Sequence, residues 1–281
     1  MKIVTRFAPS PTGFLHIGHA YSASLAWQKA QASAGHFILR IEDIDPTRCR
    51  PEFEAGIYED LAWLGLNWEE PVRRQSDHMD DYAAVLDQLY SRGLIYPCFC
   101  TRSEIVAEVA RSHSAPHGLE GPIYPGTCRH ISDAKRDQHF ADGKPYALRL
   151  NLDEALSQVP LSALTFNEMD KGVIQCDPTP FGDVVLARKE TPTSYHLAVT
   201  LDDALQGINL VVRGQDLFSA THIQRLLQSL LDLPTPDYLH HGLVSDMKGR
   251  RLAKRNKDAT IRSMRENGYT VEEVHKLIGF G

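Results

Sequence analysis

Two histidines stand three residues apart in the segment GFLHIGHA (residues 13–20), with Gly18 between them. A turn that contains proline and glycine precedes the segment and an Ala-rich helical pattern follows it, so His16 and His19 fall near a helix start. A helix N-terminus offers free N–H groups and the positive end of its dipole, and it therefore binds anions. Imidazole N–H groups can donate to phosphate oxygens there, more strongly as negative charge builds up in a transition state. The pattern therefore favours a phosphate site over a pair of ordinary core or surface histidines.

Three of the five cysteines form a second chemical pattern. Cys98 and Cys100 stand in YPCFCT, and Cys128 ends YPGTC. Three soft thiolates suit a tetrahedral zinc ion, and a buried group of reduced thiols is the alternative interpretation. A fourth ligand would complete the tetrahedron, and general zinc chemistry favours histidine for it. The candidates for that position are Tyr124, His113, His117, His130 and water.

The composition is typical of a soluble globular chain. Of its 281 residues 42% are hydrophobic, and the net charge of −6 excludes a global basic field. RNA contacts would need a local patch, for which KGRRLAKRNK (residues 248–257) is a candidate. The N-terminus has no apolar core of a signal peptide, and no apolar run approaches the roughly 20 residues of a membrane span. Together with the odd number of cysteines, this predicts reduced thiols, no membrane partner and a cytoplasmic location.

The order of predicted elements indicates an α/β fold with a parallel sheet. The segment HFILRIED (residues 36–43) is apolar at most positions, as expected of a strand that is buried on both faces. Gly35 ends the helical pattern that precedes it. The predicted strands cover residues 2–8, 36–43, 208–214 and 237–244, and the predicted helices cover residues 20–34, 52–64, 77–92 and 216–233.

A change of composition at Tyr96 predicts that a smaller subdomain is inserted into the α/β domain. The chain becomes rich in Cys, His, Pro and Gly up to about Arg129, and short strand-like runs follow. Two short helical patterns form a C-terminal tail. We therefore expect the first half of the main domain at residues 1–95, the inserted subdomain at 96–193, the second half at 194–240, and a loop with a helical tail at 241–281.

Several separated motifs resemble one known family. RFAPSPTGFLHIGHA (residues 6–20) is similar to the signature of class I aminoacyl-tRNA synthetases of the glutamyl branch, and LRIEDIDPTR (residues 39–48) matches that branch as well. GLNWEE, SYHLAVTLDD and VVRGQDLFSATHIQ follow in the same order. The resemblance covers nearly the whole chain. It implies a Rossmann-type sheet with ATP phosphates bound at the carboxyl ends of its strands, next to His16 and His19.

The end of the chain at Gly281, soon after the segment RLAKR, refines this resemblance. It favours a shorter paralogous family, the glutamyl-Q tRNA(Asp) synthetases, over full glutamyl-tRNA synthetases with their helical anticodon-binding region. That family activates glutamate with ATP and transfers it to queuosine in the anticodon of tRNA(Asp). The alternatives are a minimal glutamyl-tRNA synthetase that charges a tRNA terminus and a non-catalytic paralogue that binds glutamate or RNA. We expect a monomer.

The resemblance implies a glutamate pocket, and the residue types fit it. Glutamate carries two carboxylates and one ammonium, so a pocket for it needs arginine and an acid. Arg213 lies at the end of a predicted strand, just before Gly214, and Arg6 is the second candidate for a carboxylate. Glu42 ends another predicted strand and is the candidate partner of the ammonium. The positions that match the family's glutamate site are Arg6, Ala8, Ser10, Glu42, Tyr195 and Arg213.

The resemblance also implies an ATP site that includes a lysine loop. RLAKR (residues 251–255) occupies the place of the second class I signature, and Lys254 matches its catalytic lysine. This copy departs from the family, because Arg251 stands at a lysine position and Ala253 at a serine position. The implied catalytic residues are His16, His19 and Lys254, and the implied contacts to ATP and its Mg²⁺ are His16, Gly18, His19, Gly214, Asp216 and Lys254.

For the cysteine group, the resemblance selects Tyr124 as the fourth ligand of one zinc ion, four residues before Cys128. We expect this zinc to be structural, because its ligands lie in the predicted insertion and away from the ATP motifs.

Overall fold

The computed structural model describes residues 2–111, 117–118, 121–242 and 260–280, without the side chains of residues 108–122. Its first sheet is parallel, in the order β1-β2-β3. β1 (Val4–Phe7) pairs with β2 (His36–Ile41), which pairs with β3 (Glu69–Arg74). The helices α1 (Ile17–Ala32) and α2 (Pro51–Trp63) make the crossovers between these strands.

Alanine lets α1 approach this sheet closely. Ala20, Ala23, Ala26 and Ala30 are at most 1% exposed, and they lie three or four residues apart on one helix face. The hydroxyl of Thr5 on β1 donates to the Ala26 carbonyl (2.9 Å), which a larger helix face would prevent. The N-terminus of α1 is therefore held firmly above the end of β1.

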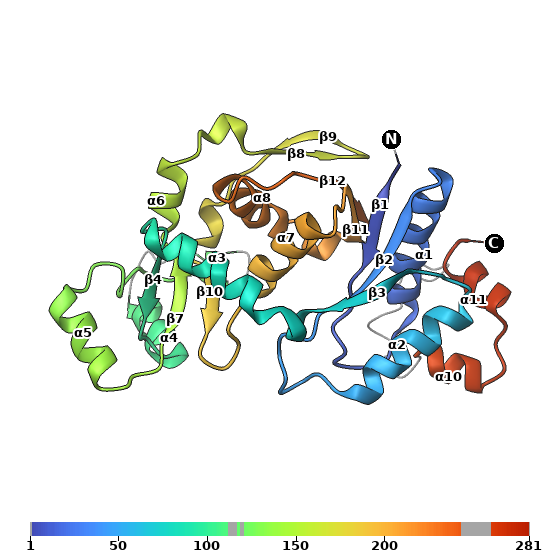
Figure 1. The fold of residues 1–281 in the computed structure, drawn as a ribbon, viewed down its shortest axis with the longest axis horizontal. Helices are drawn as coiled ribbons and strands as arrows, with labels where there is room; N and C mark the ends of the chain where they lie inside the picture. Colours follow the sequence, from blue (N-terminus) through green and yellow to red (C-terminus); the bar gives the residue numbers. More distant parts are fainter. Residues whose placement is uncertain (1, 112–116, 119–120, 243–259, 281) are drawn as a thin grey trace.

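A second sheet has the order β11-β12-β8-β9. β11 (Leu210–Gly214), β12 (Asp237–His241) and β8 (Thr165–Glu168) are parallel, whereas β9 (Gly172–Gln175) runs antiparallel to β8. The helices α7 (Tyr195–Leu205) and α8 (Ala220–Leu230) pack on this sheet (Figure 1).

One asparagine joins the two sheets. The backbone N–H of Val4 donates to Asn209 Oδ1 (2.8 Å), and the N–H of Asn209 donates to the Val4 carbonyl (3.1 Å). β1 and β11 consequently lie side by side (Figure 1). The ends of both strands, which carry Arg6 and Arg213, reach the same edge.

The third sheet is antiparallel and lies at one end of the long axis of the molecule, opposite the C-terminal helices (Figure 1). Its order is β10 (Val185–Arg188), β7 (Ala147–Leu150) and β4 (Ile95–Cys98). The remaining elements are α3 (Met79–Ser91), α4 (Arg102–Arg111), β5 (His117–Gly118), β6 (Gly121–Pro122), α5 (Asp133–Ala141), α6 (Leu152–Ser157), α10 (Ile261–Glu266), α11 (Val271–Leu277) and 3-10 turns at Gln75–His78, Leu161–Ala163, Thr179–Phe181 and Gln215–Leu217.

The predicted α/β fold with a parallel sheet is confirmed, with three local differences. α1 begins at Ile17 rather than at residue 20, because His16 caps it. β3 was not predicted, since its sequence EEPVRR lacks the apolar residues of a buried strand. β8 and β9 lie inside the range expected for the insertion; they pair with each other, and β8 also pairs with β12 of the second sheet. The division into domains stays a prediction.

Among the described residues, no helix combines the length and the apolar character that crossing a bilayer requires.

Candidate active site

A cleft of about 730 Å³ opens where the ends of β1 and β11 meet the N-terminus of α1. Every candidate residue for glutamate and ATP that the structure describes lines this cleft, whereas Lys254 lies outside the described residues. Neighbours that the sequence did not single out, such as Thr12, Ser22 and His241, also line it. The candidates on its walls are Arg6, Ala8, Ser10, His16, Gly18, His19, Glu42, Tyr195, Arg213, Gly214 and Asp216.

The two histidines form a reciprocal cap at the start of α1. The N–H of Gly18 donates to His16 Nδ1 (3.1 Å), and the N–H of His16 donates to His19 Nδ1 (3.2 Å). The two rings stack with their centroids 3.8 Å apart. A Cβ on Gly18 would lie 3.0 Å from His16 Cε1, so glycine gives the ring its room. Helix capping and ring position therefore depend on the same three residues.

This cap also sets the protonation of the rings. Burial lowers the pKa of His16, and burial together with the neighbouring His16 lowers the pKa of His19 to about 3. Both rings are therefore neutral at pH 7, and because each Nδ1 accepts a hydrogen bond, each proton sits on Nε2. Two neutral N–H donors at a helix N-terminus can bind phosphate oxygens without repelling each other.

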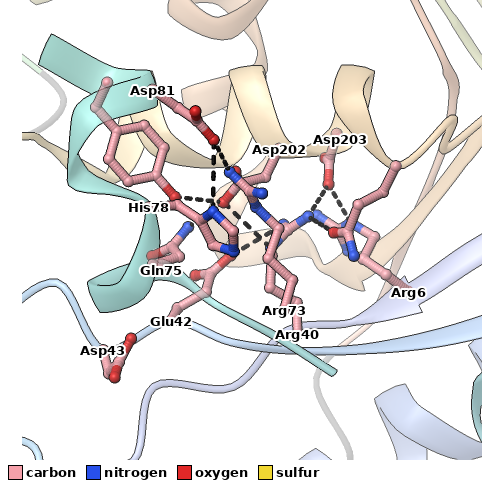
Figure 2. Close-up of polar contacts among 12 residues, drawn as sticks. Arg6, Arg40, Glu42, Asp43, Arg73, Gln75, His78, Asp81, Asp202 and Asp203 are labelled. Carbon is pink, nitrogen blue, oxygen red and sulfur yellow. Dashed lines mark hydrogen bonds and ion pairs between the residues drawn. The ribbon is translucent and has the colours of Figure 1, made fainter. Parts of the chain in front are cut away.

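A buried ion network holds the acidic and basic groups of the cleft (Figure 2). Asp203 Oδ1 accepts from Arg6 Nε (3.0 Å) and from Arg40 Nη1 (2.8 Å), and Arg40 Nη2 donates to Glu42 Oε1 (3.1 Å). Arg40 is completely buried. Burial would raise the pKa of Asp203, but Arg6 and Arg40 outweigh it and lower that pKa. Asp203 is therefore ionised and fixes the orientation of both guanidinium groups.

For Glu42, in the same network, the effect of burial on the pKa is larger than the effect of the neighbouring arginines. Burial raises its pKa, and the opposing effects of Arg40 and Arg6 do not cancel the increase. Only Oε1 of Glu42 bonds to Arg40, which leaves Oε2 without a hydrogen-bond partner among the described residues. A cation that enters the cleft would stabilise this carboxylate, so an ammonium group suits the position.

The network extends away from the cleft through the neighbouring residue of α7. Asp202 accepts hydrogen bonds from Arg73 Nε (2.9 Å), Gln75 Nε2 (2.8 Å) and the Tyr82 hydroxyl (2.9 Å). Figure 2 shows that Arg73 also contacts Asp81 on α3, to which its Nη2 donates a hydrogen bond. These contacts tie α7 to β3 and α3, and so they support the wall that carries Asp203.

On the other wall, Arg213 makes three side-chain hydrogen bonds, and its guanidinium lies over the Tyr238 ring. Its Nη1 donates to the Tyr195 hydroxyl (3.2 Å), its Nη2 to Thr221 Oγ1 (2.7 Å) and its Nε to His240 Nε2 (3.0 Å). His240 is bonded in turn to Glu168 at 2.6 Å. Arg213 is 5% exposed, and it lines the cleft together with Tyr195.

Gly214 and Asp216 follow Arg213 at the end of β11. A Cβ on Gly214 would lie only 2.4 Å from Asp216 Oδ1, so a side chain at this position would displace the Asp216 carboxylate. The turn Gln215–Leu217 brings Asp216 to the cleft, where a nucleotide contact by this residue stays a prediction.

Sequence reasoning missed Arg40, Asp203, Glu168 and His240. An arginine within the apolar strand HFILRI was the signal for Arg40, because a buried charge must be paired. The acidic pair at residues 202–203, inside the otherwise apolar helix α7, was the corresponding signal for its partner.

The buried histidines predict a pH dependence of stability. The pKa of His240 is lowered to about 3 by burial and then by Arg213, so it resembles His19. Below its ordinary pKa of about 6.5 the unfolded chain takes up protons that the folded chain refuses. The free energy of unfolding should thus be largest above pH 6.5 and fall towards pH 3, by at most about 1.4 kcal/mol per pH unit for each histidine.

Urea titrations at pH 7.5 and 5.5 measure this dependence. The variant His240→Gln should lose one histidine's share of the pH slope. Equal slopes in the wild type and in His240→Gln would contradict the assignment of a neutral His240.

The three cysteines of the predicted insertion lie together in the structure. The Sγ atoms of Cys98, Cys100 and Cys128 are all within 4.8 Å of one another. The Tyr124 hydroxyl is 3.3 Å from the first of these sulfurs and 3.5 Å from the second. Among the described residues, no histidine belongs to the group and His130 is exposed, whereas His113 and the side chain of His117 are outside them. The three thiols and the phenol could hold a metal ion.

A parallel sheet with an anion-binding helix end at its strand termini is the architecture of nucleotide-binding enzymes. The family model for the catalytic domain of class I tRNA synthetases (E and Q) matches residues 2–279. The chain therefore belongs to the class I aminoacyl-tRNA synthetase family and is a ligase of that type.

Three relatives show which members of this family the chain is similar to. A glutamyl-Q tRNA(Asp) synthetase of Rhodobacter capsulatus is 45% identical over 99% of this chain and 100% of its own length. One from Symbiobacterium thermophilum is 40% identical over 96% and 83%. A glutamate–tRNA ligase of Aquifex aeolicus is 38% identical, but this chain spans only 56% of it.

The fold comparison agrees with these relatives. The structure of a glutamate tRNA ligase from Elizabethkingia meningosepticum, in complex with its amino acid, matches with a TM-score of 0.77 and 26% identity. The match covers 96% of this chain and 54% of that ligase, so the likeness extends to about half of the solved protein.

Proposed function

We propose that this chain activates glutamate with ATP and transfers it to queuosine in the anticodon of tRNA(Asp). The observation that carries the proposal is the meeting of two arginines, a buried glutamate and two histidine N–H donors in one cleft. The names of the two most similar relatives described above support the choice of acceptor.

In the activation step, an oxygen of the glutamate α-carboxylate bonds to the α-phosphorus of ATP while the bond to pyrophosphate breaks. Arg6 and Arg213 hold the carboxylates, and Glu42 Oε2 accepts from the ammonium. His16 and His19 donate from Nε2 to phosphate oxygens, where negative charge grows as the leaving group departs. The Mg²⁺ that accompanies ATP neutralises charge on the phosphates. Transfer of the glutamyl group to queuosine then releases AMP.

A second cleft supports RNA as the acceptor. It has a volume of about 790 Å³, and Tyr195 lines both cavities. Within the described structure, its lining residues Arg102, Arg188 and Lys189 have no ion-pair partner. Phe99 and Tyr146 add aromatic rings to the same cleft. Cations with aromatic rings bind phosphates and unstacked bases, which suits a tRNA loop next to the activated amino acid.

The test is transfer of labelled glutamate to purified tRNAs. tRNA(Asp) with queuosine should accept the label, whereas tRNA(Asp) without queuosine and tRNA(Glu) should not. Label on the terminus of tRNA(Glu) would instead establish the second candidate, a minimal glutamyl-tRNA synthetase, which the likeness to the Aquifex ligase favours. Without any RNA, an absence of glutamate-dependent ATP–pyrophosphate exchange would mean a non-catalytic binding protein.

We also propose one structural zinc ion, held by Cys98, Cys100, Cys128 and Tyr124. The spacing of the sulfurs and the nearby phenol suit four-coordinate zinc, which stabilises small folded units. The ion would tie β4 to the segment that precedes α5, far from the first cleft.

Metal analysis checks this proposal. Protein purified without chelators should contain about one zinc per chain. Cys128→Ser should lower both the zinc content and the melting temperature, whereas Cys176→Ser, at a buried cysteine outside the group, should keep the zinc. A zinc content far below one per chain in the wild type would contradict the site.

A further inference from the structure

Two buried side chains stand behind Arg213. Glu168 at the end of β8 is completely buried, and the side chain of His240 on β12 has no exposed surface. Neither is among the residues that line the first cleft. Sheet pairing brings them together, because Arg213 is the register partner of His240, and β12 pairs with β8.

The hydrogen bonds of this group determine the tautomer of His240. Arg213 Nε always carries a hydrogen, so His240 Nε2, 3.0 Å away, must accept. The ring proton therefore sits on Nδ1 and points to Glu168 Oε2 at 2.6 Å. The other oxygen of Glu168 accepts from the backbone N–H of His240 (2.8 Å). Two acceptors facing one residue are what a carboxylate supplies and an amide cannot.

The same bonds orient the guanidinium. His240 occupies Nε of Arg213, Thr221 takes one hydrogen of Nη2, and Tyr195 takes one hydrogen of Nη1. One N–H on each terminal nitrogen is left without a partner among the described residues. Arg213 lines the cleft, so one remaining N–H on each terminal nitrogen can donate to the two oxygens of a carboxylate, whereas a carboxamide would face one of them with its own donor.

We propose that Glu168 and His240 are positioning residues that hold Arg213 for a substrate carboxylate and thereby set its preference over a carboxamide. This inference rests on the proposed function, because it assumes that Arg213 binds the amino acid. Glu168 fixes the tautomer of His240, and His240 supplies the lone pair that orients Arg213. The low pKa of His240, caused by burial and by Arg213, agrees with a neutral ring.

Glu168→Gln tests the tautomer. In one orientation the amide accepts from Nδ1–H and loses the bond from the backbone N–H of His240. In the other it keeps the backbone bond and donates to Nδ1, which forces the ring proton onto Nε2, against Arg213, and this second orientation predicts the change in binding. We expect the KM for glutamate in ATP–pyrophosphate exchange to rise about 10-fold to 100-fold, with the KM for ATP within about twofold. The ratio of kcat/KM for glutamate to kcat/KM for glutamine should fall in the same variant. Tyr238 lies on the same strand as His240, and Tyr238→Phe removes a buried hydroxyl that accepts from Gln228 of α8, so it should change neither KM.

Two substitutions of His240 separate positioning from stability. Gln reaches as far as Nε2 and can accept from Arg213, but it loses the bond to Glu168. Asn reaches only as far as Nδ1, so it keeps the bond to Glu168 and loses the one to Arg213. The KM for glutamate should be at least about 10-fold higher in His240→Asn than in His240→Gln, and Glu168→Gln should add little in the His240→Gln background. If His240 only stabilised the fold through its bond to the buried Glu168, the loss should instead be larger in His240→Gln, which lacks that bond.

The readouts distinguish failure of this inference from failure of the proposed function. Nitrogen-15 NMR of histidine-labelled protein should show His240 protonated on Nδ1 in the wild type, whatever the substrate. If the wild type exchanges with glutamate but Glu168→Gln has the same KM as Tyr238→Phe and His240→Asn the same KM as His240→Gln, or if the wild-type ring carries its proton on Nε2, the positioning role is wrong and the activity stands. If the wild type shows no glutamate-dependent ATP–pyrophosphate exchange, the proposed function is wrong, and so is the inferred preference of Arg213 for a carboxylate.

Discussion

Replacement of His16 by asparagine is expected to slow glutamate-dependent ATP–pyrophosphate exchange about 100-fold to 1000-fold. Asparagine is among the best N-cap residues, so its side-chain oxygen can accept from the N–H of Gly18 as His16 Nδ1 does. The substitution thus keeps the cap and removes the Nε2–H donor. The free energy of unfolding should change by less than about 0.5 kcal/mol. The loss should appear in kcat more than in either KM, because the donor acts as charge develops.

His36→Asn provides the matched control. His36 starts β2, its side chain is exposed, and within the described part of the chain it pairs with Glu69 on the surface. Exchange should stay at the wild-type rate in this variant. Exchange near that rate in His16→Asn would remove His16 from the phosphate site and leave it as a helix cap.

Arg40→Met is expected to have the largest effect on stability, a loss of about 3–5 kcal/mol in the free energy of unfolding. Burial alone would lower the pKa of Arg40, but its three carboxylate neighbours outweigh burial and raise it, so the guanidinium is always charged. Methionine replaces the stem of the arginine as far as about Nε but not the guanidinium, and it leaves Glu42, Asp202 and Asp203 with fewer partners in a buried space. Without Arg40, which lowers the pKa of Glu42 and of Asp203, these two acids would take up protons more readily in the folded variant. The loss in the free energy of unfolding should therefore shrink at low pH.

Urea denaturation of Arg40→Met and of Arg48→Met makes the comparison. Arg48 also pairs with an aspartate, Asp45, but its side chain is 72% exposed, and surface ion pairs contribute at most about 1 kcal/mol. Equal losses in the two variants would mean that the buried network contributes no more than a surface pair.

Local chemistry was enough to predict the parts of the site that lie close together in the chain. His16, Gly18 and His19 are within four residues, and the strand ends that carry Arg6 and Arg213 follow from apolar runs that stop at a turn. The start of α1 was placed three residues too late, because histidine is a rare cap and the alanine pattern begins at Ala20. The expectation thus depended on composition, whereas the true boundary depends on one side chain.

The rest of the site depends on contacts that no local pattern contains. Arg40 meets Asp203 across 163 positions of the chain, and Glu168 meets His240 across 72. Only the packing of α7 and the pairing of β12 with β8 bring these groups together. β3 shows the same limit, since a charged edge strand becomes a strand only when its neighbour β2 is present.

The Asn209 contact that joins β1 to β11 fixes the positions of these two strands along each other. Arg6 and Arg213 are anchored on different strands, and the bonds between Asn209 and Val4 fix how far apart their guanidinium groups stand. A slip of one residue would move one arginine by about 3.3 Å, more than the length of a methylene group, and would turn its side chain to the other face of the sheet. Evolution of this scaffold towards a shorter or longer dicarboxylic amino acid would therefore have to proceed by exchanging side chains, because the strands cannot be tuned in smaller steps.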